Sequence, residues 1–302
     1  MTFSDIAFVI VAGMTTRRRE TPMIKQRAHY VTTSDGVTLG GTVHGVGPPL
    51  VFLQGVIGDG DIDWGSTTGH LTDRFTCHLP SLRGRGLSDE HTDLSTSRLV
   101  EDCLTYVESL GQMAGLVGWS GGGTWALAVA AQSDAVAAVA PFEPGLLSLA
   151  DERVQAVIGY AVARTGELAA EGNLSAAARA FAGFPFHDEE IALAEEAGYF
   201  EAAGRYVPNL LSLLEQAMTH ERPLTDDPAV LGAIKAPVAV LLGSETKPFF
   251  TISARYVVDH VANARVHEVP GVGHAAPLTH PEALARALTE FFAASPEVQL
   301  QL

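Results

Sequence analysis

The sequence predicts an α/β protein with a mostly parallel central sheet flanked by helices, into which a block of helices is inserted. Short apolar runs alternate with helical patterns along most of the chain, and such alternation builds a parallel sheet covered on both faces. Residues 145–232 break this rhythm, because they are rich in Ala, Leu and Glu and contain no long β-branched run. We therefore expect an α/β core formed by residues 24–144 and 233–302, and a helical cap formed by residues 145–232.

Eight segments have the pattern of strands, and the first two are joined by Asp35-Gly36, a hairpin signal. The segments are 26–32, 37–44, 50–53, 75–79, 115–119, 135–140, 238–242 and 265–269. Helical patterns in the core cover 94–110, 121–131 and 281–292. Residues 238–242 are wholly apolar, as in a central strand, whereas residues 265–269 are half polar and suit a position nearer the sheet edge.

The composition limits the classes of partner. Hydrophobic residues make up 47% of the 302 residues, which permits a sizeable core. Acidic residues outnumber basic residues by 35 to 19, and the formal net charge is −16. This charge repels phosphate backbones and anionic lipids, so we expect a small-molecule substrate and neither nucleic acid nor a membrane as partner. The two cysteines, Cys77 and Cys103, are too few for a disulfide framework and favour a reducing, cytoplasmic location.

The first residues do not resemble a secretory signal. The apolar run 6–11 is followed by the charges of residues 17–19, whereas a signal peptide places its positive charge first. The run is also far shorter than the ~20 residues that span a bilayer. We therefore expect residues 1–23 to be a tail outside the core, either disordered or upstream of the native start.

An acidic segment follows the third predicted strand. Asp59, Asp61 and Asp63 alternate, but the Gly and Glu of a calcium-binding loop do not follow at the required positions. We interpret this segment as a solvated or helix-capping loop. No other cluster in the sequence has metal-ligand spacing, so we expect no metal and no organic cofactor.

The segment Gly118-Trp119-Ser120-Gly121-Gly122 fits the pattern G-x-S-x-G. This pattern places a serine on a strained turn between a strand and a helix, where small neighbours let the two elements approach. An apolar strand precedes the segment and a small-residue helix follows it, which is the context that the motif requires. We therefore predict that Ser120 is a nucleophile and that the Gly121 amide helps to bind an oxyanion.

A serine nucleophile needs a base within hydrogen-bond reach. His274 is the best candidate among the histidines, because it lies in a glycine-bracketed loop, Gly271-Val272-Gly273, after the last predicted strand. His280 begins the next helix and is expected to cap that helix or lie on the surface.

Residues 26–294 resemble the α/β-hydrolase superfamily, in its branch of capped serine esterases and epoxide-hydrolase-like proteins. The resemblance depends on Gln54-Gly55, the segment 81–88 (SLRGRGLS), the Ser120 motif and Gly273-His274. It implies the α/β-hydrolase fold with a cap, and it implies that the Val56 amide is the second oxyanion donor. Two positions depart from the family pattern, since the family often has His in place of Gln54 and Asp in place of Ser81. Both departures affect the pocket more than the chemistry.

The resemblance leaves the acid of the catalytic triad open. The position that the family most often uses is occupied by Thr246, which cannot stabilise an imidazolium by charge. Glu245 lies one position earlier. Glu143 follows the strand after the Ser120 motif, the position used by the related haloalkane dehalogenases. We favour Glu143 and keep Glu245 as the alternative, because ligand chemistry gathers at the carboxyl ends of strands in open α/β sheets.

These residues predict hydrolysis of an ester-like small molecule through an acyl-enzyme on Ser120. Serine at this position argues against dehalogenase or epoxide-hydrolase chemistry, because those relatives use a carboxylate nucleophile. Three alternatives remain: carbon–carbon bond hydrolysis, cofactor-free perhydrolysis, and a ligand-binding receptor on the same fold.

Overall fold

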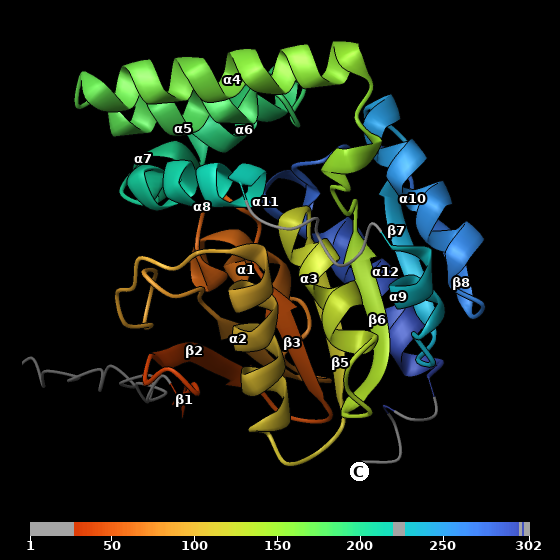
Figure 1. Ribbon diagram of the computed structural model, residues 1–302. Helices are drawn as coiled ribbons and strands as arrows, with labels where there is room; N and C mark the ends of the chain where they lie inside the picture. The colour runs from red at the N-terminus through yellow and green to blue at the C-terminus, as the bar shows by residue number, and fades with distance from the viewer. Residues whose placement is uncertain (1–26, 220–226, 296–297, 299–302) are drawn as a thin grey trace, which may run out of the picture.

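The computed structural model describes residues 27–219, 227–295 and 298. Within these ranges the predicted strands form, and they assemble into one sheet of eight strands (Figure 1). The predicted tail, residues 1–23, lies outside the described residues.

The sheet is mostly parallel and has the order β1-β2-β4-β3-β5-β6-β7-β8. Its strands are β1 (Arg27–Thr32), β2 (Thr38–Gly45), β3 (Pro49–Leu53), β4 (Thr76–Pro80), β5 (Ala114–Trp119), β6 (Val136–Phe142), β7 (Val238–Gly243) and β8 (Ala264–Val269). β2 pairs antiparallel with β1 and β4, and the remaining pairs are parallel. The apolar strands β3, β5, β6 and β7 are buried at every residue, whereas the half-polar β8 forms an edge and is mostly exposed or half-buried, as predicted.

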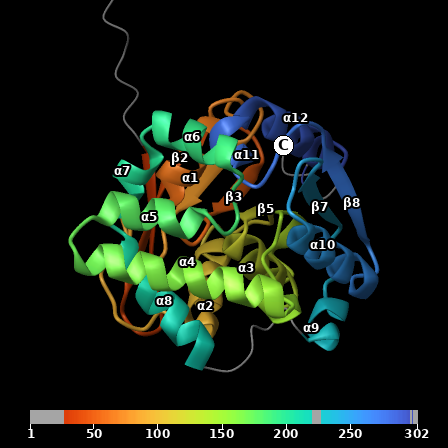
Figure 2. The ribbon, with the colours of Figure 1, turned by 90° about the horizontal axis from the view of Figure 1, so that it is seen from above.

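Helices cover both faces of the sheet (Figure 2). One layer contains α2 (Thr96–Glu108), α3 (Gly121–Ala130), α9 (Pro228–Gly232) and α10 (Pro248–His260), which pack against one another in this order. The other layer contains α1 (Gly60–Thr68), α11 (Ala276–Thr279) and α12 (Pro281–Ala293). None of the helices in the described part of the chain is long and apolar enough to cross a membrane.

The sequence patterns did not predict α1 and α10. α1 occupies the acidic segment that we interpreted as a loop, and Asp59 begins it by accepting a hydrogen bond from Ile62 N at 2.8 Å. The capping part of that interpretation is confirmed for Asp59. The solvated part is wrong for Asp63, which is fully buried. α10 is rich in aromatic and β-branched residues, so its helical conformation depends on tertiary packing more than on intrinsic propensity.

The inserted stretch forms a layer of helices above the carboxyl ends of the strands (Figure 1). This layer, called the cap helices below, consists of α4 (Glu152–Ala170), α5 (Leu174–Ala182), α6 (Asp188–Glu196), α7 (Tyr199–Gly204) and α8 (Val207–Thr219), preceded by the short 3₁₀ helix Leu147–Leu149. α9, which ends the stretch, is not counted among the cap helices, because it packs against α3 and α10. The division of the chain into a core and a separable cap stays a prediction.

Candidate active site

Ser120 occupies a sharp turn between β5 and α3. Its backbone has φ 55° and ψ −114°, in a region that non-glycine residues rarely adopt. The turn is fixed on both sides, since Ser120 N donates to Phe142 O at 3.0 Å and Ser120 O accepts from Gly123 N at 3.0 Å. This geometry presents the serine side chain at the carboxyl edge of the sheet, as the motif predicts.

The outer glycines of the motif are required by close backbone contacts. A Cβ atom at Gly118 would lie 2.2 Å from Gly122 O, and a Cβ atom at Gly122 would lie 2.3 Å from Gln54 O. The strand, the turn and the helix can therefore approach this closely only without side chains at these two positions.

His274 lies in the loop after β8 and is held by Glu143. The Nδ1 atom of His274 is 2.7 Å from Oε2 of Glu143, and both side chains are almost completely buried, at 2% and 0% exposure. An ionised carboxylate can only accept a hydrogen bond, so Nδ1 carries a proton and Nε2 is left free to act as a base. This is the tautomer that a serine nucleophile requires.

Glu143 is positioned by the end of β6 and by the neighbouring strand. Its second oxygen, Oε1, accepts a hydrogen bond from Gly243 N at 2.9 Å. Glu143 also has a positive φ of 45°, a conformation that costs energy in a non-glycine residue and that clusters at functional sites. The carboxylate therefore has one oxygen on the sheet backbone and the other on the imidazole.

Glu245, the alternative acid, lies in a different environment. It is exposed, its carboxylate accepts from the hydroxyl of its neighbour Ser244 at 3.1 Å, and its backbone carbonyl is 2.8 Å from Nε2 of His187. Of the two candidate carboxylates, the structure brings Glu143 into contact with His274.

Aromatic side chains fix the plane of the imidazole. The ring of Phe250 stacks on His274 with a centroid distance of 3.9 Å and an interplanar angle of 15°. The indole Nε1 of Trp119, the residue before Ser120, donates to the backbone oxygen of His274 at 2.8 Å. His274 is therefore connected both to the Ser120 turn and to α10.

Val56 and Gly121 lie opposite each other beside Ser120. A Cβ atom at Gly121 would lie 2.6 Å from Cγ1 of Val56, and both residues line a cavity that Ser120 also lines. In the described part of the chain, neither amide donates to a protein acceptor. Ser120 Oγ likewise makes no hydrogen bond to His274, although both residues line one small cavity. Such contacts often tighten only when substrate binds.

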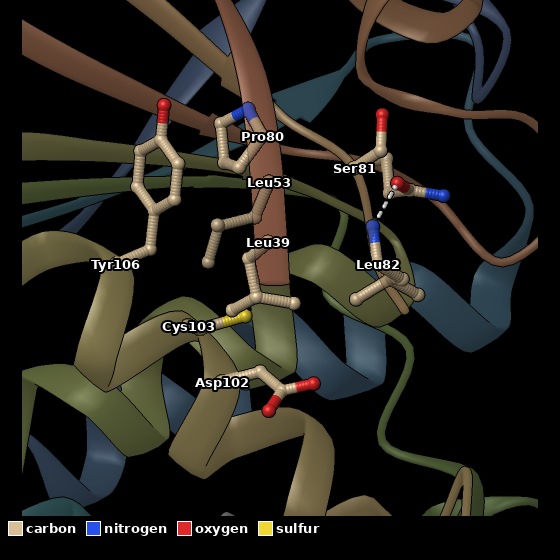
Figure 3. A pocket seen from close by; sticks show the side chains of 9 residues that line it. Leu39, Leu53, Pro80, Ser81, Leu82, Asp102, Cys103 and Tyr106 are labelled. Carbon is tan, nitrogen blue, oxygen red and sulfur yellow. Dashed lines mark hydrogen bonds between the residues drawn. The ribbon is translucent and has the colours of Figure 1, made fainter. Parts of the chain in front are cut away.

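The two departures from the family pattern hold the loop after β3 in place. The Gln54 side chain donates to Gly58 O at 2.5 Å and accepts from Leu82 N at 2.8 Å. Figure 3 shows the latter bond as a dashed line, with Ser81 and Leu82 at one side of a small internal cavity. Ser81 Oγ accepts from Gly60 N at 3.3 Å. Both residues therefore connect the segment after β3 with the loop after β4.

Asp63 of α1 supports the same loop from inside the protein. Its Oδ2 accepts from Gly55 N at 2.8 Å, and its Oδ1 accepts from the hydroxyl of Tyr199 in α7 at 3.0 Å. Burial raises the pKa of this carboxyl to about 7, and the nearby charge of Asp59 adds to the rise. Asp63 therefore connects a cap helix to the residue that precedes Val56.

Arg85 connects this region to another cap helix. The guanidinium is buried, its Nη1 donates to Gly58 O at 2.7 Å, and its Nε donates to Oδ1 of Asn209 in α8 at 2.6 Å. Burial lowers the pKa of Arg85 to about 10. The segment 81–88, which carried part of the family resemblance, thus serves as a bridge between the loop after β3 and the cap.

Two small cavities adjoin Ser120. One, of about 60 Å³, extends from Val56 and Gly121 toward the cap and α10. Its side chains are apolar: Leu147, Phe181, Phe184, Pro185, Leu214, Phe249 and Phe250. The other, of about 20 Å³, lies between Ser120 and His274 and is lined by Trp119, Phe186 and Tyr199 among others. Among the described residues, no Asp, Glu, Lys or Arg lines either cavity.

Several side chains around the site carry no signal in the sequence. Phe250 belongs to an aromatic pair whose pattern is typical of a core, and Asp63 belongs to an acidic segment whose pattern is typical of a solvated loop. Glu190, whose Oε1 accepts from Ala275 N at 2.7 Å, is one of three acids in the first turn of α6, a usual place for acids in any helix. In the described ranges, no group of three or more His, Cys, Asp or Glu side chains could hold a metal ion.

A serine on a strand–helix elbow, beside a buried histidine–carboxylate pair at the carboxyl edge of a mostly parallel sheet, defines the α/β-hydrolase class. The model of the alpha/beta hydrolase family matches residues 43–287. The chain therefore belongs to the α/β-hydrolase family, which confirms the resemblance found in the sequence.

Solved structures share this fold. An α/β hydrolase from Sphaerobacter thermophilus has 25% identity and a TM-score of 0.68, over 87% of this chain and 100% of the other. A thermophilic esterase from Thermogutta terrifontis has 21% identity and a TM-score of 0.67, with coverages of 88% and 98%. A candidate epoxide hydrolase from Pseudomonas aeruginosa has 20% identity and a TM-score of 0.72, with coverages of 92% and 98%. None of the curated proteins compared with the chain matches it.

Proposed function

We propose that this α/β hydrolase is a serine hydrolase that cleaves a neutral, ester-like small molecule through an acyl-enzyme on Ser120. The observation that carries the proposal is the 2.7 Å contact between Glu143 and His274 beside the elbow serine. A serine hydroxyl is a poor nucleophile until an oriented base removes its proton, and a carboxylate on Nδ1 provides that orientation.

The first half of the reaction acylates the serine. His274 Nε2 takes the proton of Ser120 as Oγ attacks the carbonyl carbon, and Glu143 stabilises the resulting imidazolium. The amides of Val56 and Gly121 donate to the oxyanion. When the tetrahedral intermediate collapses, the bond to the leaving oxygen breaks and His274 returns its proton to the departing alcohol.

The second half restores the free serine. Water enters beside His274, gives a proton to Nε2 and attacks the acyl carbon, while the same two amides bind the oxyanion. Collapse then releases the carboxylic acid and returns the proton to Ser120 Oγ. His274 acts as base and then as acid in each half of the reaction, so both halves require the same orientation of its imidazole.

The cavity walls support a neutral acyl group of short length. The 60 Å³ cavity is lined by Ser120 and by both proposed oxyanion donors but not by His274, so it suits the acyl side of the substrate. Its apolar walls offer no partner for a charge, and an unpaired buried charge is costly. Its volume of about 60 Å³ suits a short acyl chain.

The test can be carried out before the natural substrate is identified. A fluorophosphonate should label the protein, and mass spectrometry of the peptides should place the label on Ser120. Turnover should then be measured with p-nitrophenyl esters of two to eight acyl carbons, alongside an ester with a charged acyl group. We expect labelling of Ser120, the highest kcat/KM with esters of short neutral acids, and poor turnover of the charged ester.

A different outcome would identify one of the alternatives. A labelled Ser120 together with no ester hydrolysis would favour carbon–carbon hydrolysis, or perhydrolysis if turnover requires hydrogen peroxide. A protein that no fluorophosphonate labels would contradict the proposal and favour a ligand-binding receptor.

A further inference from the structure

The peptide bond that follows the candidate base is held at both of its polar ends. Its carbonyl, His274 O, accepts from Trp119 Nε1 at 2.8 Å, and its amide, Ala275 N, donates to Oε1 of Glu190 at 2.7 Å. Trp119 belongs to the core and precedes the nucleophile, whereas Glu190 belongs to cap helix α6. The orientation of this peptide plane is thus set jointly by the core and by the cap.

Burial and a second hydrogen bond hold the Glu190 side chain in this position. It is only 7% exposed, and its second oxygen, Oε2, accepts from His187 N at 2.9 Å. A Cβ atom at Gly273 would lie 2.6 Å from Oε1 of Glu190, so the glycine before His274 makes room for the carboxylate. A carboxylate bound to backbone amides forms a charge-assisted hydrogen bond, which is shorter and stronger than a neutral one.

We infer that Glu190 is a positioning residue that fixes His274 in its catalytic orientation, so that the cap completes the catalytic geometry in addition to covering the pocket. The inference rests on the proposed function, because it requires His274 to act as the base. Without Glu190 the Ala275 amide would lose its acceptor inside the protein, and the loop would rotate to find another. A displacement of about 1 Å at a reacting group can cost on the order of 10²-fold in rate.

A second role of Glu190 has to be separated from this one. The carboxylate also closes a capping box at the start of α6 through its bond to His187 N. Loss of a helix-capping bond lowers stability but leaves the bond to Ala275 N in place, so it does not by itself reorient His274. The experiment must therefore compare variants that differ in reach and in charge.

Three substitutions make this comparison. Glu190→Asp keeps the charge at the helix N-terminus but is one methylene too short to reach Ala275 N. Glu190→Gln keeps the length and one acceptor oxygen for Ala275 N. Glu190→Ala removes both bonds. Glu189→Ala is the matched control, since Glu189 is the exposed neighbour in the same helical turn.

The readouts are kcat and KM with a short p-nitrophenyl ester, the rate of Ser120 phosphonylation, and Tm. We expect Glu190→Asp and Glu190→Ala to lose about 10- to 100-fold in kcat and in phosphonylation rate, with KM almost unchanged. Glu190→Gln should stay within about 3-fold of the native kcat with a lower Tm, because it retains the bond to Ala275 N and loses the helix-capping bond to His187 N. Glu189→Ala should match the native protein in every measurement.

The outcomes separate this inference from the proposed function. Native-like phosphonylation of Ser120 in Glu190→Asp would overturn the inference and leave the proposed function intact. An equal loss of kcat in Glu190→Asp and Glu190→Gln would also overturn it, because the bond to Ala275 N, which only Gln can keep, would then not determine the rate. If Glu190→Ala does not fold, the comparison between Glu190→Asp and Glu190→Gln still tests the inference. A native protein without reactive Ser120 would overturn both.

Discussion

Glu143 and His274 are 131 positions apart in the chain, yet Oε2 of the first lies 2.7 Å from Nδ1 of the second. The sheet order explains the contact, because β6 and β8 flank β7 and the carboxylate of Glu143 extends across the end of that central strand. Gly243, at the end of β7, both donates its amide to Glu143 and leaves room for it, since a Cβ atom there would lie 3.0 Å from Oε1. An acid supplied by β6 can thereby serve a histidine that follows β8.

Removal of the proposed nucleophile or of the proposed base should abolish turnover. We expect Ser120→Ala and His274→Ala each to lower kcat by about 10⁴- to 10⁶-fold, because the two residues act as a unit. Steady-state kinetics with the best ester should be measured together with a thermal melt. Ser66→Ala, at an exposed helical serine, is the control and should behave like the native protein. Near-native turnover by Ser120→Ala would refute the acyl-enzyme mechanism.

The two candidate acids should differ sharply. Glu143→Gln keeps an acceptor for Gly243 N but presents an amide N–H₂ to His274, which forces the wrong tautomer. We expect a loss of about 10⁴-fold in kcat with little change in Tm. Glu245→Gln, at an exposed loop residue, should stay close to native. The reverse result would assign the acid to Glu245, and mild effects of both would indicate a Ser–His dyad.

The buried carboxyl of Asp63 should make stability depend on pH. Its folded-state pKa is about 7, above the ordinary value of 3.8, so the folded protein holds a proton that the unfolded chain releases. Stability from this group is therefore full below about pH 4 and is lost as pH rises to about 7. With about 1.36 kcal/mol for each pKa unit, the loss is on the order of 4 kcal/mol.

Asp63→Asn should remove this dependence. Its amide can accept from Gly55 N and donate to the Tyr199 hydroxyl oxygen without titrating. Denaturant unfolding at pH 5 and pH 8 should show that the variant gains stability relative to the native protein at the higher pH. Asp73→Asn, at an aspartate whose side chain is 76% exposed, is the control. An equal pH dependence in native protein and Asp63→Asn would show that Asp63 is ionised throughout.

A larger acyl cavity should change the preferred substrate. Leu214 of α8 is 8% exposed and lines the 60 Å³ cavity, so Leu214→Ala should extend it. We expect the optimum of kcat/KM in the p-nitrophenyl ester series to move to acids about two to three carbons longer. A pocket methylene is worth roughly 10-fold or more in discrimination, so the shift should be measurable. Leu213→Ala, at a buried neighbour that does not line the cavity, should keep the native optimum.

Local sequence patterns were enough to predict the class of fold, the serine at the strand–helix turn and the histidine loop. Each depends on residues close together in the chain. Strand–helix alternation follows from local hydrophobic patterns. The Ser120 turn needs glycines two positions away on either side, because a Cβ atom at either glycine would lie 2.2 or 2.3 Å from a backbone oxygen. The half-polar composition of 265–269 likewise predicted an edge strand, since a central strand would bury those polar side chains.

The identity of the carboxylate that contacts His274 depends on the packed sheet, because Glu143 and Glu245 both follow strands and differ in the residues that the fold places beside them. The same holds for Asp63, whose neighbours in sequence suggest solvent but whose side chain is buried between α1, the loop after β3 and α7. Glu190 is a further case, since only the packing of α6 on the histidine loop brings it to Ala275 N. Contacts of this kind join residues distant in the chain, and their energy depends on packing that local sequence patterns do not encode.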